Sequence, residues 1–169
     1  MLIGGGIAGL ATAIALSRHG WRCTILEQQL EHRRPGHGMV LPPAGRLALE
    51  SLTGGPLGRF SAPIESFEIC SRDGLLRHRY PISGSLSLLH RDLLSLLQQS
   101  LPAAVEVLEQ GCAGLEPGPG GDYRAVDLVG RRWQADLIVA ADGIHSHCRG
   151  CLFPEALLTP ELVTELVLV

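Results

Sequence analysis

The chain's 169 residues, 46% of them hydrophobic, suit one globular domain with a sizeable core and exclude an intrinsically disordered protein. The formal net charge of −3, with no basic run longer than a pair, argues against nucleic acid as a partner. Five scattered cysteines, an odd number, do not form a disulfide framework, and no signal peptide is recognisable, so the sequence predicts a cytoplasmic protein.

The opening stretch predicts a βαβ unit that ends in an acid. An apolar run at residues 1–3 leads into three glycines in the GxGxxG register. These glycines are Gly4, Gly6 and Gly9. A helix is predicted over Ile7–Arg18, and a second apolar run at Cys23–Leu26 ends at Glu27. Strand, turn, helix, strand and acid in this order are typical of a dinucleotide-binding unit.

Each part of this unit has a physical role in binding a dinucleotide. Gly4 permits a tight exit from the first strand, and Gly6 lets a pyrophosphate approach the backbone. Gly9 lets the helix lie close against the sheet. The helix N-terminus offers unpaired N–H groups and a positive dipole end to phosphates. Glu27 can accept hydrogen bonds from a pair of ribose hydroxyls.

Two membrane interpretations of the same apolar residues stay open. The stretch could be a signal-peptide core or a membrane helix, and Gly5 and Gly9 have GxxxG spacing. No positive residues precede it, and Arg18 interrupts it before the roughly 18 residues that a spanning helix needs. Glu27 would have no role in either case. We therefore expect no integral membrane segment.

A loop, a helix and a hairpin are predicted next. The polar stretch Glu31–Gly38 predicts a loop, and Pro43–Thr53 predicts a helix that ends at two glycines. This helix is expected to share one apolar face among Leu47, Leu49 and Leu52. Ile64–Cys70 and Leu75–Tyr80 predict a β-hairpin around a turn that contains glycine.

The remaining elements place an antiparallel layer before a last strand. An amphipathic helix is predicted over Leu88–Leu101, and a strand over Ala104–Leu108. The leucines of that helix at helical spacing are Leu89, Leu93, Leu96 and Leu97. A meander follows, with strands at Cys112–Leu115, Tyr123–Leu128 and Arg131–Gln134. The continuous apolar run Ala135–Ala141 predicts a parallel strand buried on both faces. This order predicts an α/β fold with an inserted antiparallel layer.

Three segments in the expected order resemble the class A flavoprotein monooxygenases, the para-hydroxybenzoate hydroxylase-like family. They are the glycine turn with Glu27, the LHRDLL segment Leu89–Leu94, and the AADGIHSHCR segment Ala140–Arg149. The likeness runs from about residue 1 to about residue 155. We therefore expect residues 1–155 to form the N-terminal part of an FAD-binding domain and residues 156–169 to form a divergent C-terminal tail.

The resemblance implies a Rossmann-like FAD-binding domain of three layers and names its cofactor contacts. Those positions are Gly4, Gly6, Ile7, Ala8, Gly9, Glu27, Arg91, Cys112, Asp142 and Gly143. The N–H groups around Gly6 would hold the FAD pyrophosphate, Arg91 would reach the phosphate or ribityl region, and the backbone near Cys112 would border the adenine. Asp142 would serve both the flavin and an incoming nicotinamide nucleotide.

The resemblance also implies a reaction. NAD(P)H reduces the flavin, molecular oxygen adds to it, and the flavin hydroperoxide hydroxylates a small, aromatic substrate. The residues themselves identify no catalytic group. An NAD(P)-dependent dehydrogenase using the same βαβ unit, and a non-catalytic nucleotide-binding module, stay open as alternatives.

Several motif residues also have simpler explanations. Arg91 could follow a helix start and face solvent, and Asp142-Gly143 could be an ordinary turn after a strand. Two histidines and two cysteines near the end of the chain could suggest zinc, but their HxHCxxC spacing matches no standard zinc pattern. These are His145, His147, Cys148 and Cys151. We predict no metal site.

The chain departs from the family in what it lacks. A second Gly-Asp motif and much of the substrate pocket have no counterpart, and Gln28-Gln29 stand where a basic residue is common. The chain therefore resembles the N-terminal part of such an enzyme, and its activity alone stays open. A half-built site leaves apolar surface and sheet edges uncovered, so we expect poor solubility or self-association.

Overall fold

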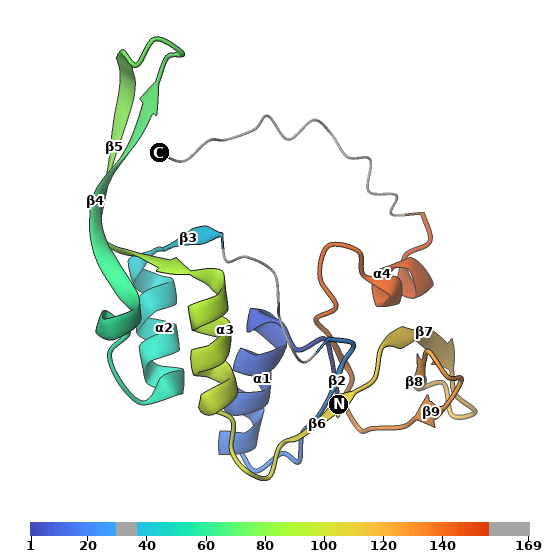
Figure 1. The fold of residues 1–169 in the computed structure, drawn as a ribbon. Coiled ribbons are helices and arrows are strands. Elements are labelled where there is room, and N and C mark those ends of the chain that lie inside the picture. Colours follow the sequence, from blue (N-terminus) through green and yellow to red (C-terminus); the bar gives the residue numbers. More distant parts are fainter. Residues whose placement is uncertain (30–36, 156–169) are drawn as a thin grey trace.

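The computed structural model describes residues 1–29 and 37–155, which form three sheets and the helices around them (Figure 1). The elements are β1 (Leu2–Ile3), α1 (Ile7–Arg18), β2 (Thr24–Glu27), β3 (Gly38–Leu41), α2 (Pro43–Thr53), the 3₁₀ helix η1 (Gly58–Phe60), β4 (Ser61–Cys70), β5 (Leu76–Leu89), α3 (His90–Gln99), β6 (Glu106–Glu109), β7 (Cys112–Pro117), β8 (Tyr123–Asp127), β9 (Arg132–Trp133), β10 (Val139–Ala140) and α4 (His147–Leu152).

The central sheet is parallel and has the strand order β10-β1-β2-β6. Leu2 and its register partner Ile25 belong to the larger hydrophobic core, on the helical side of the sheet. Ile3 belongs to a second, smaller core on the side of the meander. Successive residues of a strand point to opposite faces, so this two-residue strand serves both cores. The predicted βαβ unit is confirmed.

Helices α1, α3 and α2 lie side by side on one face of this sheet (Figure 1). Leu10 and Ile14 of α1 and Leu93 and Leu97 of α3 are buried in the larger core. The meander of β7, β8 and β9 lies on the other face, and its Ala125 is fully buried beside Ile3. The predicted architecture, a parallel sheet between helices and an antiparallel meander, is confirmed.

The two helices predicted after the βαβ unit also form, with corrections to their apolar faces. Helix α2 has the predicted bounds, but Leu47 is 66% exposed and does not share the buried face of Leu49. Helix α3 begins at His90 because Leu88 and Leu89 continue β5. The helical spacing of the leucines predicted an earlier start, but Leu88 pairs with both β3 and β4, and this pairing extends the strand to Leu89.

The predicted hairpin is confirmed but is longer than expected. Strand β5 continues past the predicted end at Tyr80 and pairs with both β4 and β3, forming a sheet of order β3-β5-β4. The far end of β4 and β5 extends away from the rest of the protein (Figure 1). Pro81 and Gly84 interrupt the apolar alternation of β5, so its sequence does not indicate one long strand.

The last predicted strand differs most from expectation. Only Val139–Ala140 are paired, and Ala140 is exposed, so burial of 135–141 on both faces was wrong. Strand β10 is at the edge of the sheet, with β1 as its one neighbour among the described residues. Most of the predicted loop and all of the predicted tail lie outside the described residues. No helix in the described part of the chain is long and apolar enough to span a membrane.

Candidate functional site

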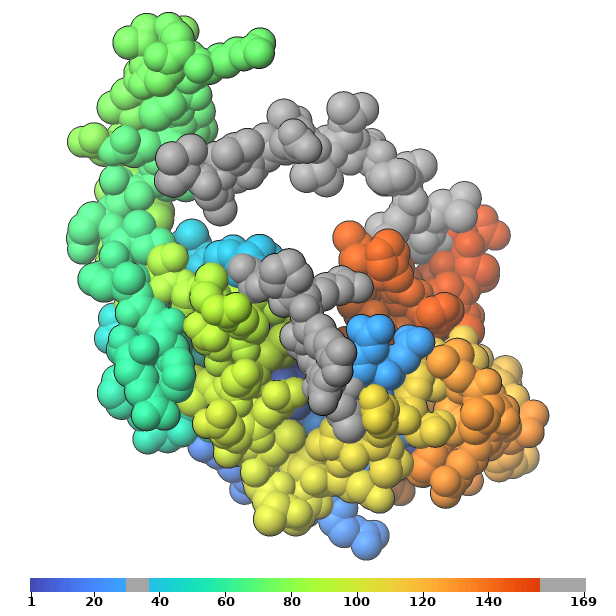
Figure 2. All heavy atoms as spheres, viewed as in Figure 1, coloured from blue at the N-terminus to red at the C-terminus, as the bar shows by residue number. Residues whose placement is uncertain are grey.

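A cleft of about 530 Å³ opens at the carboxyl end of the parallel sheet. Gly4, Gly6 and Glu27 line it from the first βαβ unit. Arg91, Cys112, Asp142 and Gly143 line it from segments far along the chain. Figure 2 shows the end of β2 in bright blue between the yellow segment after β6 and the orange-red α4 segment. The segments that carry the three sequence motifs thus meet at one cleft.

The three motif glycines meet different surroundings. Gly4 has φ +101°, and a Cβ there would collide with the backbone of Ala141. A Cβ on Gly9 would collide with the carbonyl oxygen of Gly4, so Gly9 lets α1 start close against the turn itself. A Cβ on Gly6 would meet no atom within 4 Å. Gly4 and Gly9 therefore allow close packing, whereas Gly6 leaves the cleft open.

The start of α1 faces this cleft, and its N-cap residue has no side chain with which to cap it. Its N-cap is Gly6, which makes no side-chain hydrogen bond, and its first turn carries no acidic residue. The N–H groups of Ile7 and Ala8 belong to this first turn, where an α-helix leaves donors unpaired. The helix dipole adds partial positive charge at the same place. This end of α1 suits an anion.

Glu27 braces the glycine turn. One of its carboxylate oxygens accepts a hydrogen bond from the Gly5 N–H at 2.5 Å, and the other accepts one from the Gln29 N–H at 2.8 Å. The sequence predicts a ribose contact for Glu27 but gives no signal of its contact with Gly5. Each carboxylate oxygen has a second acceptor site, so this brace leaves capacity for a ligand hydroxyl.

Asp142 holds the start of α4 while it lines the cleft. Its carboxylate accepts hydrogen bonds from the Ser146 hydroxyl at 2.7 Å and from the Cys148 N–H at 3.1 Å. Ser146 in turn accepts from the Arg149 N–H at 2.9 Å and caps the helix. Partial burial opposes ionisation of Asp142, but these hydrogen bonds outweigh it and lower its pKa. Asp142 is therefore a carboxylate at neutral pH, and it both forms the turn and borders the cleft.

Arg91 and several imidazoles give the cleft positive or ionisable groups. The Arg91 side chain is 58% exposed, and its Nε lies 3.5 Å from Asp92, so it borders both cleft and solvent. His37 and His90 also line the cleft, and their rings stack at 5.0 Å between centroids. The sequence predicts no role for either histidine, because His37 belongs to no motif and the likeness at LHRDLL concerns the arginine.

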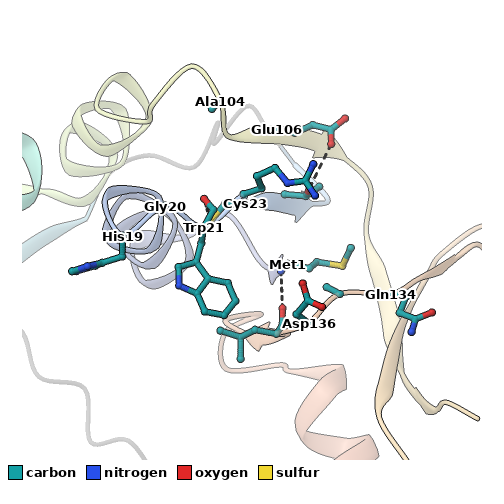
Figure 3. Close-up of a pocket in the computed structure, with 13 residues that line it drawn as sticks. Met1, His19, Gly20, Trp21, Cys23, Ala104, Glu106, Gln134 and Asp136 are labelled. Atoms are coloured by element: carbon teal, nitrogen blue, oxygen red, sulfur yellow. Dashed lines mark hydrogen bonds between the residues drawn. The ribbon is translucent and has the colours of Figure 1, made fainter. Parts of the chain in front are cut away.

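A second cavity, of about 620 Å³, lies at the opposite end of the same sheet (Figure 3). Trp21, Glu106 and Asp136 line it, and the Met1 ammonium beside it donates a hydrogen bond to the Leu137 carbonyl at 2.7 Å. None of the predicted cofactor positions borders it. Open α/β sheets bind ligands beyond the carboxyl ends of their strands, which favours the first cleft.

Comparisons with known proteins identify relatives over most of this chain. A family model described as an NAD(P)-binding Rossmann-like domain matches residues 2–36. The chain is 31% identical over 160 residues to the probable 2-heptyl-3-hydroxy-4(1H)-quinolone synthase AqdB2 of Rhodococcus erythropolis, covering 88% of this chain and 40% of that protein. It is 34% identical over 167 residues to the 3-amino-4-hydroxybenzoate 2-monooxygenase PtnB3 of Streptomyces platensis, covering 89% and 41%.

Solved structures agree with these relatives. The tetrameric form of 2-methyl-3-hydroxypyridine-5-carboxylic acid oxygenase matches with a TM-score of 0.76 and 26% identity, over 90% of this chain and 41% of that one.

A further relative by sequence is the FAD-dependent monooxygenase OpS4 of Beauveria bassiana, which is 30% identical over 183 residues, 95% of this chain and 40% of that protein. The likeness to FAD-dependent monooxygenases is thus confirmed, for their N-terminal portion. This chain spans about two-fifths of the length of the relatives it matches.

Proposed function

We propose that this chain is the FAD-binding portion of an NAD(P)H-dependent flavoprotein monooxygenase that hydroxylates a small aromatic substrate. The observation that carries the proposal is the meeting of the glycine turn, Arg91 and Asp142-Gly143 at one cleft. A simple dehydrogenase needs the glycine turn but neither of the other two. The relatives that match about 90% of the chain include FAD-dependent monooxygenases, which supports the same cofactor.

The residues at the cleft fit FAD. The open space beside Gly6 admits a pyrophosphate that any larger residue would obstruct, and the uncapped start of α1 supplies N–H donors at Ile7 and Ala8. A cleft of about 530 Å³ is in the usual range for cofactor sites. When bound, FAD supplies the redox chemistry and the activation of oxygen that side chains lack.

Residues of this chain would bind and orient the cofactor. Glu27 would accept the adenosine ribose hydroxyls on its remaining acceptor sites, and the backbone near Cys112 would border the adenine. Arg91 would donate charge-assisted hydrogen bonds to the phosphates or ribityl chain. Asp142, held ionised by its own hydrogen bonds, would accept from the flavin side and from an incoming nicotinamide nucleotide.

The printed names of relatives support an aromatic substrate. One acts on 3-amino-4-hydroxybenzoate, and the structure of Pseudomonas aeruginosa PqsL, matched with a TM-score of 0.74 at 25% identity, is a complex with 2-aminobenzoylacetate. The proposed partners of this chain are such a substrate, molecular oxygen and NAD(P)H. We assign residues 1–155 to the N-terminal part of an FAD-binding domain and 156–169 to a tail of divergent sequence. Whether this chain is active alone is a question for experiment.

Two further features concern the state of the protein. Its five cysteines are free thiols, which suits a reducing compartment, and we place the protein in the cytoplasm. The projecting hairpin exposes Ile69, Leu75, Leu76 and Tyr80. Exposed apolar groups of this kind favour association, so self-association of the chain belongs to the proposal.

The test is a titration of the purified chain with FAD, followed by flavin absorbance and fluorescence. We expect saturable binding of one FAD per chain, and displacement by ADP-containing nucleotides. Binding of NADH with no binding of FAD would favour the dehydrogenase alternative, which the description of the family model over residues 2–36 supports. FAD that binds tightly but is not reduced by NADH or NADPH would favour a non-catalytic nucleotide-binding module.

A further inference from the structure

Helix α4 brings one cysteine against another on the meander side of the sheet. Cys148 of α4 is fully buried, and Cys112 at the start of β7 packs against the same small core of Ile3 and Ala125. Cys112 is half-buried and also lines the 530 Å³ cleft. Cys112 therefore borders the cleft, and Cys148 is sealed behind it.

We infer that Cys112 and Cys148 form a redox-active thiol pair, a site at which a small peroxide produces a disulfide between β7 and α4. The inference goes beyond the proposed function and does not depend on it, because the thiols react or fail to react whether or not the chain binds FAD. Transient disulfides of this kind are the usual form of disulfide in reducing compartments.

Access and ionisation both select Cys112 as the thiol that reacts first. The Cys112 thiol donates hydrogen bonds to the Gly114 and Val126 carbonyl oxygens at 3.3 and 3.4 Å. A side-chain hydrogen bond with Cys148 is the largest influence on Cys112, whose pKa is lowered to about 7. The same interaction, together with burial, raises the pKa of Cys148 and keeps it a thiol. The thiolate is the reactive form of cysteine, so an oxidant that enters the cleft meets the more reactive sulfur.

The reaction balances with hydrogen peroxide as the oxidant. The Cys112 thiolate attacks one peroxide oxygen, an S–O bond forms, the O–O bond breaks, and hydroxide leaves to take up a proton as water. The Cys148 sulfur then attacks the sulfenic sulfur of Cys112, the S–S bond forms, and the hydroxyl leaves with the Cys148 proton as a second water. Two thiols thereby lose two electrons and two protons, and one peroxide becomes two waters.

Cys151 is the competing partner, and its contacts direct it elsewhere. It lies one helical turn after Cys148 and is exposed, and its sulfur accepts a hydrogen bond from the Leu115 N–H at 3.4 Å. Cys148 instead belongs to the small buried core against which Cys112 packs, and its interaction with Cys112 is the largest cause of the rise in its pKa. The reactive pair therefore joins two elements, and it is not the Cys148–Cys151 pair that the CRGC spacing suggests.

The disulfide would act on the segment that carries Asp142. The Cys148 N–H donates to the Asp142 carboxylate at 3.1 Å, and Ser146 of the same turn donates to its other oxygen. A covalent bond from Cys148 to β7 therefore fixes the start of α4 beneath the cleft. Oxidation of Cys148 would therefore affect the geometry around Asp142, because both residues belong to the turn that starts α4.

Tryptic mapping can test the pairing because arginines separate all three cysteines. Cleavage after arginine places Cys112 in peptide 92–124, Cys148 in peptide 133–149 and Cys151 in peptide 150–169. The reduced chain is treated with one equivalent of hydrogen peroxide, its remaining thiols are alkylated, and the digest is analysed by mass spectrometry. We expect a disulfide between peptides 92–124 and 133–149 and the loss of two free thiols. The reaction rate should rise about tenfold from pH 6 to pH 8 as Cys112 ionises.

Variants separate the two steps. Cys112→Ser should abolish the disulfide, and Cys148→Ser should leave a Cys112 sulfenic acid that a 1,3-dione reagent traps. Cys70→Ser, which changes an exposed cysteine on the hairpin, should react as the parent does. A disulfide from peptide 92–124 to peptide 150–169, a Cys112 sulfenic acid that persists in the parent, or five thiols unchanged by peroxide would each overturn the inference.

Discussion

The parallel sheet has a cavity at each end, of about 530 Å³ beyond the carboxyl ends of its strands and about 620 Å³ beyond the amino ends. They differ in what the backbone offers. The carboxyl-end cleft is bordered by the N-terminus of α1 and by Gly6, where an added Cβ would meet no atom within 4 Å. It is also bordered by the Asp142 carboxylate, which accepts hydrogen bonds from Ser146 and Cys148. The amino-end cavity is lined by Trp21, by the acids Glu106 and Asp136, and by Arg22 and the Met1 ammonium group. The groups that line a cavity, and not its volume, identify a phosphate-binding site.

The largest effect is expected where the turn at the carboxyl end is packed most tightly. Gly4→Ala places a methyl group against the Ala141 backbone at φ +101°, so we expect a loss of about 3 kcal/mol or more in unfolding free energy. Gly20→Ala is the matched control, because Gly20 lines the amino-end cavity at φ +82° with no atom within 4 Å. Strain alone should cost it about 1 kcal/mol. Equal losses in urea unfolding would contradict the packing role of Gly4.

The next effect is on binding and not on stability. Gly6→Val should fold normally, because Gly6 has φ −73° and open space beside it, but its side chain should block the cleft. We expect FAD binding to weaken by about tenfold or more, measured by fluorescence titration. Gly55→Val makes the same chemical change at another open position without positive φ and should bind as the parent does. Unchanged affinity in Gly6→Val would show that the turn does not hold the pyrophosphate.

A smaller effect is expected at Asp142, and it depends on pH. Its pKa is lowered in the folded chain, so its ionised form contributes stability above the unfolded pKa near 3.8, and this is lost as pH falls through the lower folded value. Asp142→Asn should lose about 1–2 kcal/mol at pH 7, from weaker hydrogen bonds to Ser146 and Cys148. The difference in unfolding free energy between the parent and Asp142→Asn, measured by urea unfolding, should be smaller at pH 3 than at pH 7. Asp136→Asn, in the amino-end cavity, should change stability by less than about 0.5 kcal/mol.

The smallest effect on stability is expected at Arg91. Its side chain is 58% exposed, so Arg91→Ala should change unfolding free energy by less than about 0.5 kcal/mol. FAD affinity should still fall several-fold, because a charge-assisted contact is lost. Arg22→Ala removes the same charge from the amino-end cavity and should leave FAD affinity as it is. Equal FAD affinity of the two variants would show that Arg91 faces solvent and does not contact the cofactor.

Local sequence patterns were sufficient to predict the parts of the fold in which the local backbone geometry requires a particular residue type. The GxGxxG spacing predicted the turn at Gly4 and the start of α1 at Ile7, because only glycine fits at Gly4 and Gly9. Patterns failed where pairing partners decide the structure. Strand β5 continues through Pro81 and Gly84 because two neighbouring strands pair with it. Strand β10 is an exposed edge although its sequence is apolar, since burial depends on what covers a strand.

Contacts within the candidate site were predictable only in part. The motifs predicted that Asp142 and Glu27 border the same cleft, but not that Glu27 holds the Gly5 amide or that Ser146 holds Asp142. The proximity of Cys112 to Cys148 has no sequence signal, because it depends on how α4 packs on the meander. Such contacts follow from tertiary packing, which a single sequence does not display.

The brace between Glu27 and the Gly5 amide has a consequence for how a ligand is received. Because Glu27 at the end of β2 accepts a hydrogen bond from the loop after β1, this contact holds the loop in place without a ligand. Association then carries little entropic penalty for ordering the receptor, and more of each new contact appears as affinity. Preorganisation of this kind suits a cofactor that stays bound through many turnovers.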